Sequence, residues 1–339
     1  MLDKSAYRSY RHFVGFLVLW FACSLLAVAK GPLGWCGASS SVLPPVEMWE
    51  VCMAIRLPRV LLASLCGAAL AVAGCVMQGL LRNDLASPAV LGLGGAANLM
   101  CVALVVGAPS YVELSGVLQL AGFLGCALAF ALLWGIARIC GSDVHHLLLL
   151  GVACAAIWGA LTMLLLASVL EQHELLARAM HWMMGGFTAA TWLDIGGCLA
   201  PLLLGLGLAW QQADALDMWA MHGETAQTMG VDLRYLSVSA VVAVALLLAV
   251  CAAVAGQLPF VGLIVPHLMR LLGHRYHADL MAFSAVLGAT LAVVADLCGR
   301  MLRPPVEIEA GVFTSLLGGV FFLGLLIYSR VGKQYYAGR

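Results

Sequence analysis

Four arginines stand in two tight pairs at the ends of apolar stretches: Arg56 with Arg59, and Arg300 with Arg303. A guanidinium presents a planar fork of donors that pairs with a carboxylate through two parallel hydrogen bonds. One hypothesis is therefore a docking surface for an acidic protein. The alternative is that these side chains only reach from a helix end to the polar edge of a lipid bilayer, as arginines in such positions often do.

The elements that must carry these arginines are membrane helices. The chain of 339 residues is 63% hydrophobic and 10% charged, with a mean hydropathy of +1.01, whereas soluble domains carry roughly 25% charged residues. An integral membrane protein built of helices can accommodate this much apolar surface. We expect an all-α fold with about ten transmembrane helices, the eighth of them short and interrupted by proline. The expected spans lie near 13–29, 60–80, 90–107, 115–137, 147–169, 191–210, 237–255, 259–272, 281–299 and 311–329.

The distribution of basic residues orients these spans, because basic loops prefer the cytoplasmic side. With the N-terminus inside, eleven of the 17 basic residues fall on the cytoplasmic side and six outside, and four of the six are the arginine pairs. Both termini are therefore expected in the cytoplasm. The 17 acidic residues balance the 17 basic ones, which argues against nucleic acid as a partner.

A polar loop of about residues 211–236 lies between the sixth and seventh predicted spans. Within it, Met221–Val231 could form a short amphipathic helix with Ala226, Met229 and Val231 on one face and Gly230 closing it. The plainest alternative is a helix that lies on the membrane surface. Since no long linker or visible repeat divides the chain, residues 1–339 are expected to form a single transmembrane domain.

The sequence does not indicate catalysis. The chain has three lysines and none completes GxxxxGK[ST], so it lacks a P-loop, and neither GxSxG nor HExxH occurs. Most of the 12 cysteines lie in apolar runs, where cysteine acts as a small hydrophobic residue. Cys36 and Cys52 share one predicted outer loop, so a disulfide between them is one option. We expect no enzymatic activity, no cofactor and no metal site.

Several segments together resemble the FecCD-type permeases, which are membrane subunits of ABC importers for ferric siderophores, haem and vitamin B12. The segments are Arg56–Arg59, the elbow Arg82–Pro88, Met221–Val231, Gly256–Arg270, Ala295–Arg300 and Glu307–Thr314. The resemblance runs from Arg56 to about Phe322 and implies the fold of a type II ABC importer permease. This chain departs from the family pattern at Asp84, Glu309 and Val320, where proline is usual, and at His222, where glycine is common.

The resemblance implies three functional sites. Arg56, Arg59 and Arg300 would receive the substrate-binding protein outside the membrane. Asn83 and Leu85 would belong to the cytoplasmic gate. The residues that would couple the permease to its ATPase are Gly223, Glu224, Thr225, Ala226, Met229 and Gly230.

The function that the resemblance implies is a permease subunit of an ABC importer, which moves a metal chelate across the bacterial inner membrane by alternating access. The implied partners are two cytoplasmic ATP-binding subunits, a periplasmic or extracellular substrate-binding protein, a second permease copy, identical or homologous, and membrane lipid. The segment Ala179–Phe187 looks more like the vitamin B12 branch than the siderophore branch. The alternative function, an ion-coupled secondary transporter, would need an acid or base at mid-span, and most span centres here hold Ala, Leu, Gly, Val and Cys.

Overall fold

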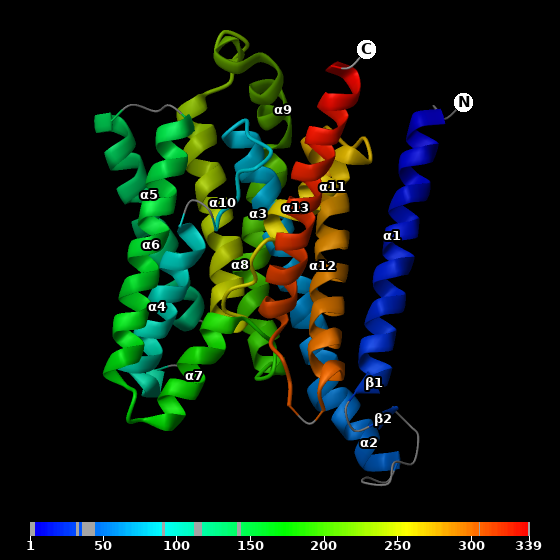
Figure 1. Cartoon of the computed structure of the whole chain (residues 1–339), viewed down its shortest axis with the longest axis vertical. Coiled ribbons are helices and arrows are strands. Elements are labelled where there is room, and N and C mark those ends of the chain that lie inside the picture. Colours follow the sequence, from blue (N-terminus) through cyan, green and yellow to red (C-terminus); the bar gives the residue numbers. More distant parts are fainter. Residues whose placement is uncertain are drawn as a thin grey trace.

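The fold is built almost entirely of helices (Figure 1). The computed structural model describes residues 4–31, 34–35, 45–89, 92–111, 117–140, 144–304 and 306–337. Within those ranges, 7 helices are long and apolar enough to cross a membrane. They are α1 (Lys4–Ala29), α3 (Leu57–Leu80), α5 (Val117–Cys140), α6 (Val144–Ser168), α8 (Trp192–Gln211), α10 (Leu233–Val254) and α12 (His277–Leu302). Shorter apolar stretches form α4 (Leu93–Gly107), α11 (Val261–Leu271) and the first part of α13 (Ala310–Ala337).

Each of the ten predicted spans therefore corresponds to an apolar helix, and the predicted all-α membrane fold is confirmed. The eighth span is short, as its prolines predict: α11 has 11 residues. At 1.5 Å per residue it covers about 16 Å, roughly half of the hydrocarbon thickness of a bilayer. The loop that precedes α11 must therefore lie inside the apolar layer of the protein.

Shorter elements occupy the two ends of the helix bundle. They are the strands β1 (Lys30–Gly31) and β2 (Gly34–Trp35), the helices α2 (Pro45–Val51), α7 (His173–Met184) and α9 (Ala213–His222), the π-helical turn η1 (Cys52–Arg56) and the 3-10 turns η2 (Pro109–Tyr111) and η3 (Gly223–Ala226). The antiparallel β1–β2 pair and α2 lie at one end of the bundle, whereas α9 and both chain termini lie at the other (Figure 1). We call these the α2 end and the α9 end.

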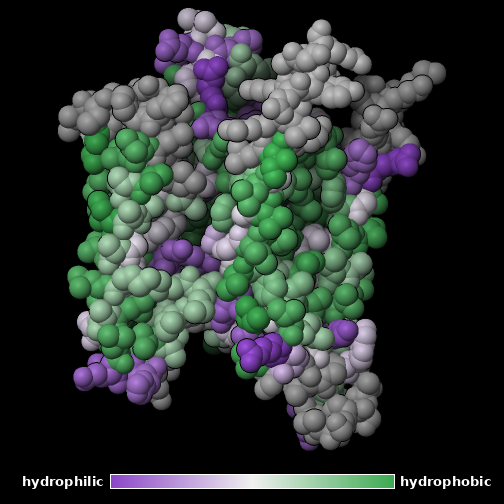
Figure 2. Space-filling model, in the orientation of Figure 1, coloured by the Kyte–Doolittle hydropathy of each residue, from purple (hydrophilic) through white to green (hydrophobic). Residues whose placement is uncertain are grey.

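The surface has the pattern of a membrane protein. Hydrophobic side chains cover the middle of the face seen in Figure 2, and hydrophilic groups gather toward the two ends. Helix α1 lies at the side of the bundle against α12, and most of its apolar side chains are exposed. Exposed apolar residues on a membrane helix contact lipid at no cost, so the outward-facing leucines of α1, α6 and α13 need no protein partner.

The core is organised around α3, which packs against α12, α10, α11 and α8. Two glycine pairs permit the closest contacts: a Cβ at Gly67 would overlap the backbone of Gly288 in α12, and a Cβ at Gly74 would overlap Gly262 in α11. Small residues let membrane helices approach until their backbones touch, which replaces the hydrophobic driving force that lipid does not supply. Helices α3, α11 and α12 therefore form one closely packed unit.

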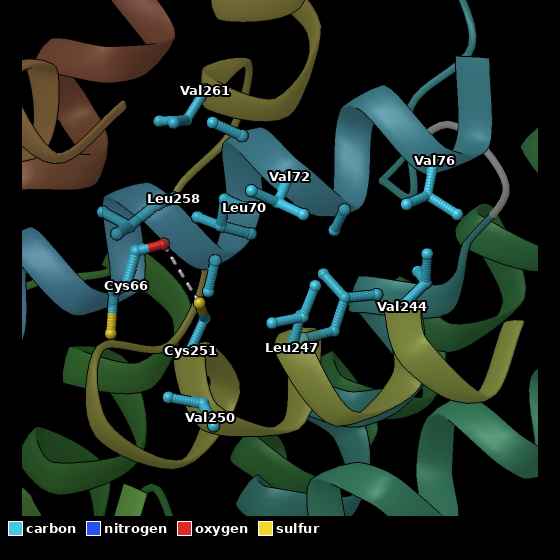
Figure 3. Packing of buried hydrophobic residues seen from close by; sticks show 14 of the residues in the cluster. Cys66, Leu70, Val72, Val76, Val244, Leu247, Val250, Cys251, Leu258 and Val261 are labelled. Carbon is cyan, nitrogen blue, oxygen red and sulfur yellow. Dashed lines mark hydrogen bonds between the residues drawn. The ribbon is translucent and has the colours of Figure 1, made fainter. Parts of the chain in front are cut away.

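Figure 3 shows how α3 meets α10 through apolar side chains, with Leu70 and Val76 of α3 facing Leu247 and Val244. The Cys251 thiol donates to the carbonyl oxygen of Cys66 at 3.4 Å. Cysteine thus acts as a small buried residue, as predicted, and the same holds for Cys75, Cys126 and Cys154. Cys52 is disulfide-bonded, and Cys36, which the sequence offered as one option for its partner, lies outside the described residues.

Candidate functional site

Arg59 of α3 forms the centre of an ionic cluster at the α2 end. Its Nε donates to Asp296 Oδ1 at 2.9 Å and its Nη2 lies 2.8 Å from the same oxygen. Its Nη1 donates to Glu307 Oε2 at 2.7 Å. The Arg59 side chain is 7% exposed, Asp296 is 2% exposed and Glu307 is 29% exposed. The cluster therefore joins α3, α12 and the segment before α13 through charge-assisted hydrogen bonds in a largely dry environment.

The other two predicted docking arginines belong to the same buried region. Arg300 Nε lies 3.1 Å from Asp296 Oδ2, and its Nη2 donates to the carbonyl oxygen of Ala27 at 3.1 Å. Arg56 Nη1 donates to the carbonyl oxygens of Val28 and Ala29, at 3.3 and 3.2 Å. These contacts hold the end of α1 against α3 and α12.

The structure thus brings Arg56, Arg59 and Arg300 together, but as buried side chains. Asp296 and Glu307 both pair with Arg59. Arg303, the fourth arginine of the two pairs, is exposed. The burial itself was not predicted, because it arises where α1, α3 and α12 meet and no single segment contains it.

The elbow after α3 is a tight turn closed by its own backbone. Asn83 N–H donates to Gln78 O and Arg82 N–H to Gly79 O, the two bonds of a Schellman motif. Arg82 takes the left-handed position with φ +49°, where glycine is usual. Its guanidinium lies 5.5 Å from the ring centroid of Trp219, and this cation–π contact helps to offset the backbone strain.

The predicted gate residues lie on this elbow. The Oδ1 of Asn83 accepts from the Leu85 backbone N–H at 2.9 Å, which fixes the turn. The Leu85 side chain is 55% exposed, so it is free to contact another molecule or segment. Asp84, where the family usually has proline, lies 3.4 Å from Arg270 Nη1 of α11, and Arg270 also pairs with Gln78. This departure therefore adds a link between the elbow and α11.

Residues 223–231, which we call the coupling segment, form η3 and a closing turn. Val231 N–H donates to Ala226 O and Gly230 N–H to Gln227 O, and Gly230 has φ +97°. This is again a Schellman motif, so the prediction that Gly230 closes the segment is confirmed. Ala226 and Val231 are buried as predicted. Placing Met229 on the same face was wrong, because it lies within the closing turn, where its side chain is 55% exposed.

The rest of the coupling segment is largely exposed to solvent. Glu224, Thr225, Gln227 and Thr228 are exposed, whereas Gly223 is buried beside the Arg82 guanidinium. His222, where the family commonly has glycine, accepts from Thr225 Oγ1 through its carbonyl oxygen at 2.7 Å. Any residue at this position can supply that backbone carbonyl, so the departure from glycine leaves the hydrogen bond of the turn unchanged.

Helix α9 anchors the coupling segment to the bundle. Trp219 Nε1 donates to the carbonyl oxygen of Leu80 at the end of α3, at 2.8 Å. Asp217 Oδ1 accepts from the His277 backbone N–H at 2.9 Å and lies 2.5 Å from His277 Nδ1. These anchors were not predicted. The only signal for them in the sequence is an aspartate and a tryptophan two residues apart just before the coupling segment.

A cavity of about 350 Å³ lies between α3, α4, α6, α7, α10 and α11, next to the elbow. Its wall is mostly apolar, and its polar members include Asn98, Thr162 and Gln257. The sequence signal for this cavity is Asn98, because a polar residue inside an apolar membrane helix is a candidate functional residue. In the part of the chain that the structure describes, no three His, Cys, Asp or Glu residues gather as a metal site.

Comparisons with known proteins agree with this arrangement. The FecD permease of the Fe(3+) dicitrate transport system of Escherichia coli (strain K12) is 35% identical over 310 residues, which cover 91% of this chain and 95% of that protein. The hemin transport permease HmuU of Yersinia pestis is 33% identical over 329 residues, covering 94% and 96%. The vitamin B12 import permease BtuC of Vibrio vulnificus (strain CMCP6) is 36% identical over 279 residues, covering 81% and 82%.

Solved structures share the fold. An inward-facing metal-chelate type ABC transporter superposes with a TM-score of 0.81 at 25% identity, covering 94% of this chain and 99% of that chain. PsaBC from Streptococcus pneumoniae shares the fold with a TM-score of 0.61. The model of the FecCD transport family matches residues 16–328. This chain is therefore a multi-pass membrane protein that belongs to the FecCD transport family.

Proposed function

We propose that this chain is the permease subunit of an ABC importer that carries a metal chelate across the bacterial inner membrane by alternating access. Its membership of the FecCD transport family and its similarity to permeases for ferric dicitrate, hemin and vitamin B12 support this function. The chain has no P-loop, so ATP hydrolysis is assigned to two separate ATP-binding subunits.

Two observations support a cytoplasmic α9 end. Cys52, at the α2 end, is disulfide-bonded, and disulfides persist in oxidising compartments outside the cytoplasm. Arg82, Arg234 and Arg275 are exposed near the opposite end, in agreement with the cytoplasmic preference of basic residues. The chain termini, which lie at the α9 end (Figure 1), are then cytoplasmic.

The observation that supports a coupling role is that the coupling segment is exposed and yet firmly attached to the helix bundle. The coupling segment presents Glu224 and Met229 to solvent, while α9 holds it to the ends of α3 and α12 through Trp219 and Asp217. A force applied to this segment by an ATPase would therefore reach both helices. The elbow with Asn83 and Leu85 lies beside Trp219, so the same displacement would move the gate as a rigid body.

We further propose that the substrate-binding protein docks at the α2 end, where one of its own carboxylates displaces a carboxylate that Arg59 holds. Arg59 already holds Asp296 and Glu307, so a glutamate of the partner would replace Glu307, the more exposed of the two acids. Arg56 and Arg300 would raise the positive potential beneath this site. The replacement Glu307→Gln should then strengthen docking, and Glu50→Gln on the exposed surface of α2 is its control.

A second copy of this chain would complete the transport pathway. Helix α13 presents a row of exposed apolar residues that includes Leu316, Val320 and Leu323, which suits either lipid or another membrane helix. A homodimer is the simplest assembly with one gene product.

The test is native mass spectrometry of the chain purified with its cellular partners in mild detergent. We expect two permease copies with two ATPase subunits. A Glu224→Ala/Met229→Ala variant should lose the ATPase, because it removes exposed contacts of the coupling segment. Glu171→Ala/Gln172→Ala, which changes two exposed residues between α6 and α7, should retain it.

Two results would contradict the proposal. If the coupling variant retained the ATPase and normal ATP-driven uptake, the coupling role of this segment would be wrong. If the purified chain alone, without any ATPase, carried out ion-driven uptake, the secondary transporter would be the correct function. If ATP binding inside changes the affinity for the binding protein outside, docking outside must change the affinity for ATP by the same factor, since coupling between two binding sites is reciprocal.

A further inference from the structure

The cavity next to the elbow has the position of a transport site. Ser87, Pro88 and Ala89 of the elbow line it, so it lies next to the proposed gate. Helices α4 and α11 both begin at it, with Gly94 and Gly262 of their first turns in its wall. Transport sites in membrane proteins are commonly built where discontinuous helices begin within the membrane. Its volume of about 350 Å³ falls within the range of small-molecule pockets.

One buried polar atom in the wall lacks a partner. Asn98 of α4 is 1% exposed, and its Oδ1 accepts no hydrogen bond from any described residue. A buried amide that makes no hydrogen bond is costly, and native proteins rarely retain one without a reason. Asn98 lines the cavity, so a molecule inside the cavity is placed to satisfy it.

The chemistry of the wall restricts what that molecule can be. None of the described lining residues is Asp, Glu, Lys, Arg or His. The neutral polar side chains are Ser87, Asn98, Thr162 and Gln257, and Met163 and Met183 add soft, adaptable apolar surface. A carboxylate placed here would lose its hydration without gaining a charged partner, which is strongly unfavourable. An uncharged amide would find matching donors and acceptors.

The cavity is open to the protein surface and contains space that no side chain fills. Ala89, Gly159 and Met163 of its lining are exposed, which places the mouth at the elbow and the outward side of α6. A Cβ added at Gly94 or at Gly159 would meet no atom within 4 Å. On the face shown in Figure 2, hydrophilic groups lie recessed between the α4–α7 helices and α13. The cavity can therefore admit the edge of a larger molecule whose remainder stays outside.

We propose that this cavity receives an uncharged, amide-bearing edge of the chelate during transport, with Asn98 as the specificity-determining residue. The inference rests on the importer function proposed above and narrows its substrate. Ferric citrate and haemin present carboxylates, whereas the periphery of a corrinoid carries neutral carboxamides. The uncharged wall therefore favours a corrinoid over ferric citrate or haemin as the cargo.

The test uses proteoliposomes that hold the complete importer, with cyanocobalamin, haemin and ferric citrate as separate probes. We expect ATP-driven uptake of cyanocobalamin in preference to the other two. Gly159→Leu should lower this uptake at least about tenfold, because it fills a pocket that the ligand needs. Gly207→Leu is the matched control: this α8 glycine also has no atom within 4 Å of an added Cβ, and it does not line the cavity.

Asn98→Leu tests the polar contact, because leucine keeps the branching of the asparagine side chain and removes its amide. It should lower cyanocobalamin uptake about two- to tenfold, the effect of one neutral hydrogen bond. Gly94→Val provides a second cavity-filling variant should Gly159→Leu fail to assemble with its partners, and assembly is checked by native mass spectrometry.

The outcomes separate the two proposals. Preferred uptake of ferric citrate or haemin, or cyanocobalamin uptake that neither Asn98→Leu nor the filled variants change, would overturn the corrinoid site and leave the importer intact; the cavity would then hold only water. Absence of ATP-driven uptake of all three probes by an assembled complex that hydrolyses ATP would overturn the importer function for these chelates, and the cavity proposal with it.

Discussion

The two ends of the α3–α12 pair hold their charges in different ways. At the α2 end, Arg59, Arg300 and Asp296 have side chains that are 2% to 7% exposed and share several charge-assisted hydrogen bonds. At the α9 end, the Arg270–Asp84 pair involves an aspartate side chain that is 60% exposed. Buried ion pairs are costly to break because each partner would remain as an uncompensated charge, whereas exposed pairs contribute about 0–1 kcal/mol.

This difference indicates which end can move at little cost. The α2 end is clamped by ionic contacts that water does not readily replace. The α9 end is held by links that solvent can substitute, apart from the more buried Asp217–His277 contact. In an alternating-access cycle, opening at the α9 end would then require less energy than separating α3 from α12 at the α2 end. Four experiments test this comparison.

The largest effect is expected for Asp296→Ala. It leaves Arg59 and Arg300 buried without their shared carboxylate, so the free energy of unfolding should fall by about 3–5 kcal/mol. Denaturant titration in mixed micelles measures this change. Asp279→Ala, on the exposed first turn of the same helix, is the control and should cost about 1 kcal/mol or less. An equal loss in the two variants would remove the basis for a clamped α2 end.

The next effect concerns the Asp217–His277 contact at the α9 end. The ring of His277 contacts Asp217 Oδ1, so a double-mutant cycle with Asp217→Asn and His277→Gln should give a coupling energy of about 1.5–3 kcal/mol for this contact. The backbone N–H of residue 277 donates to Asp217 whether the side chain is histidine or glutamine, and it does not enter the coupling energy. The same variants should weaken the dependence of ATP hydrolysis on substrate in the assembled importer. A coupling energy near zero would show that α9 is held by Trp219 and apolar packing instead.

A third variant tests how closely α3 and α12 are packed midway between the α2 end and the α9 end. Gly67→Ala places a methyl group against the backbone of Gly288, so we expect a loss of about 1–3 kcal/mol from overpacking. Gly135→Ala in α5, where a Cβ meets no atom within 4 Å, should be neutral or slightly stabilising. If Gly67→Ala behaved like the control, α3 and α12 would be free to separate, and neither end could report to the other.

The smallest effect is expected for Asp84→Ala. Its partner Arg270 keeps Gln78, and the aspartate is mostly exposed, so stability should change by about 1 kcal/mol or less. Raising the salt concentration should reduce even this difference. A loss comparable to that of Asp296→Ala would mean that the α9 end is clamped as firmly as the α2 end, and the comparison would fail.

Much of the fold could be predicted because membrane helices are recognised by the length and apolar composition of their segments. The ten apolar helices, the short α11 and the closing role of Gly230 followed from hydropathy, proline and glycine. The identity of the candidate sites followed from motif resemblance. The burial of Arg56, Arg59 and Arg300, the anchoring of α9 and the position of Met229 did not follow, since each depends on contacts between segments that are far apart in the sequence.

The sequence by itself therefore determined that this protein is a helical membrane protein, because bilayer thickness and the cost of exposed backbone leave few other solutions for such a composition. The resemblance of its motifs to the FecCD-type permeases indicated the family. The tertiary structure alone decided how its charged and polar groups are used. Asp296 meets Arg59 across 237 positions of sequence, and the unpartnered oxygen of Asn98 faces a cavity built by six helices. Such pairings depend on the close approach of α3, α12 and their neighbours, which local sequence does not encode.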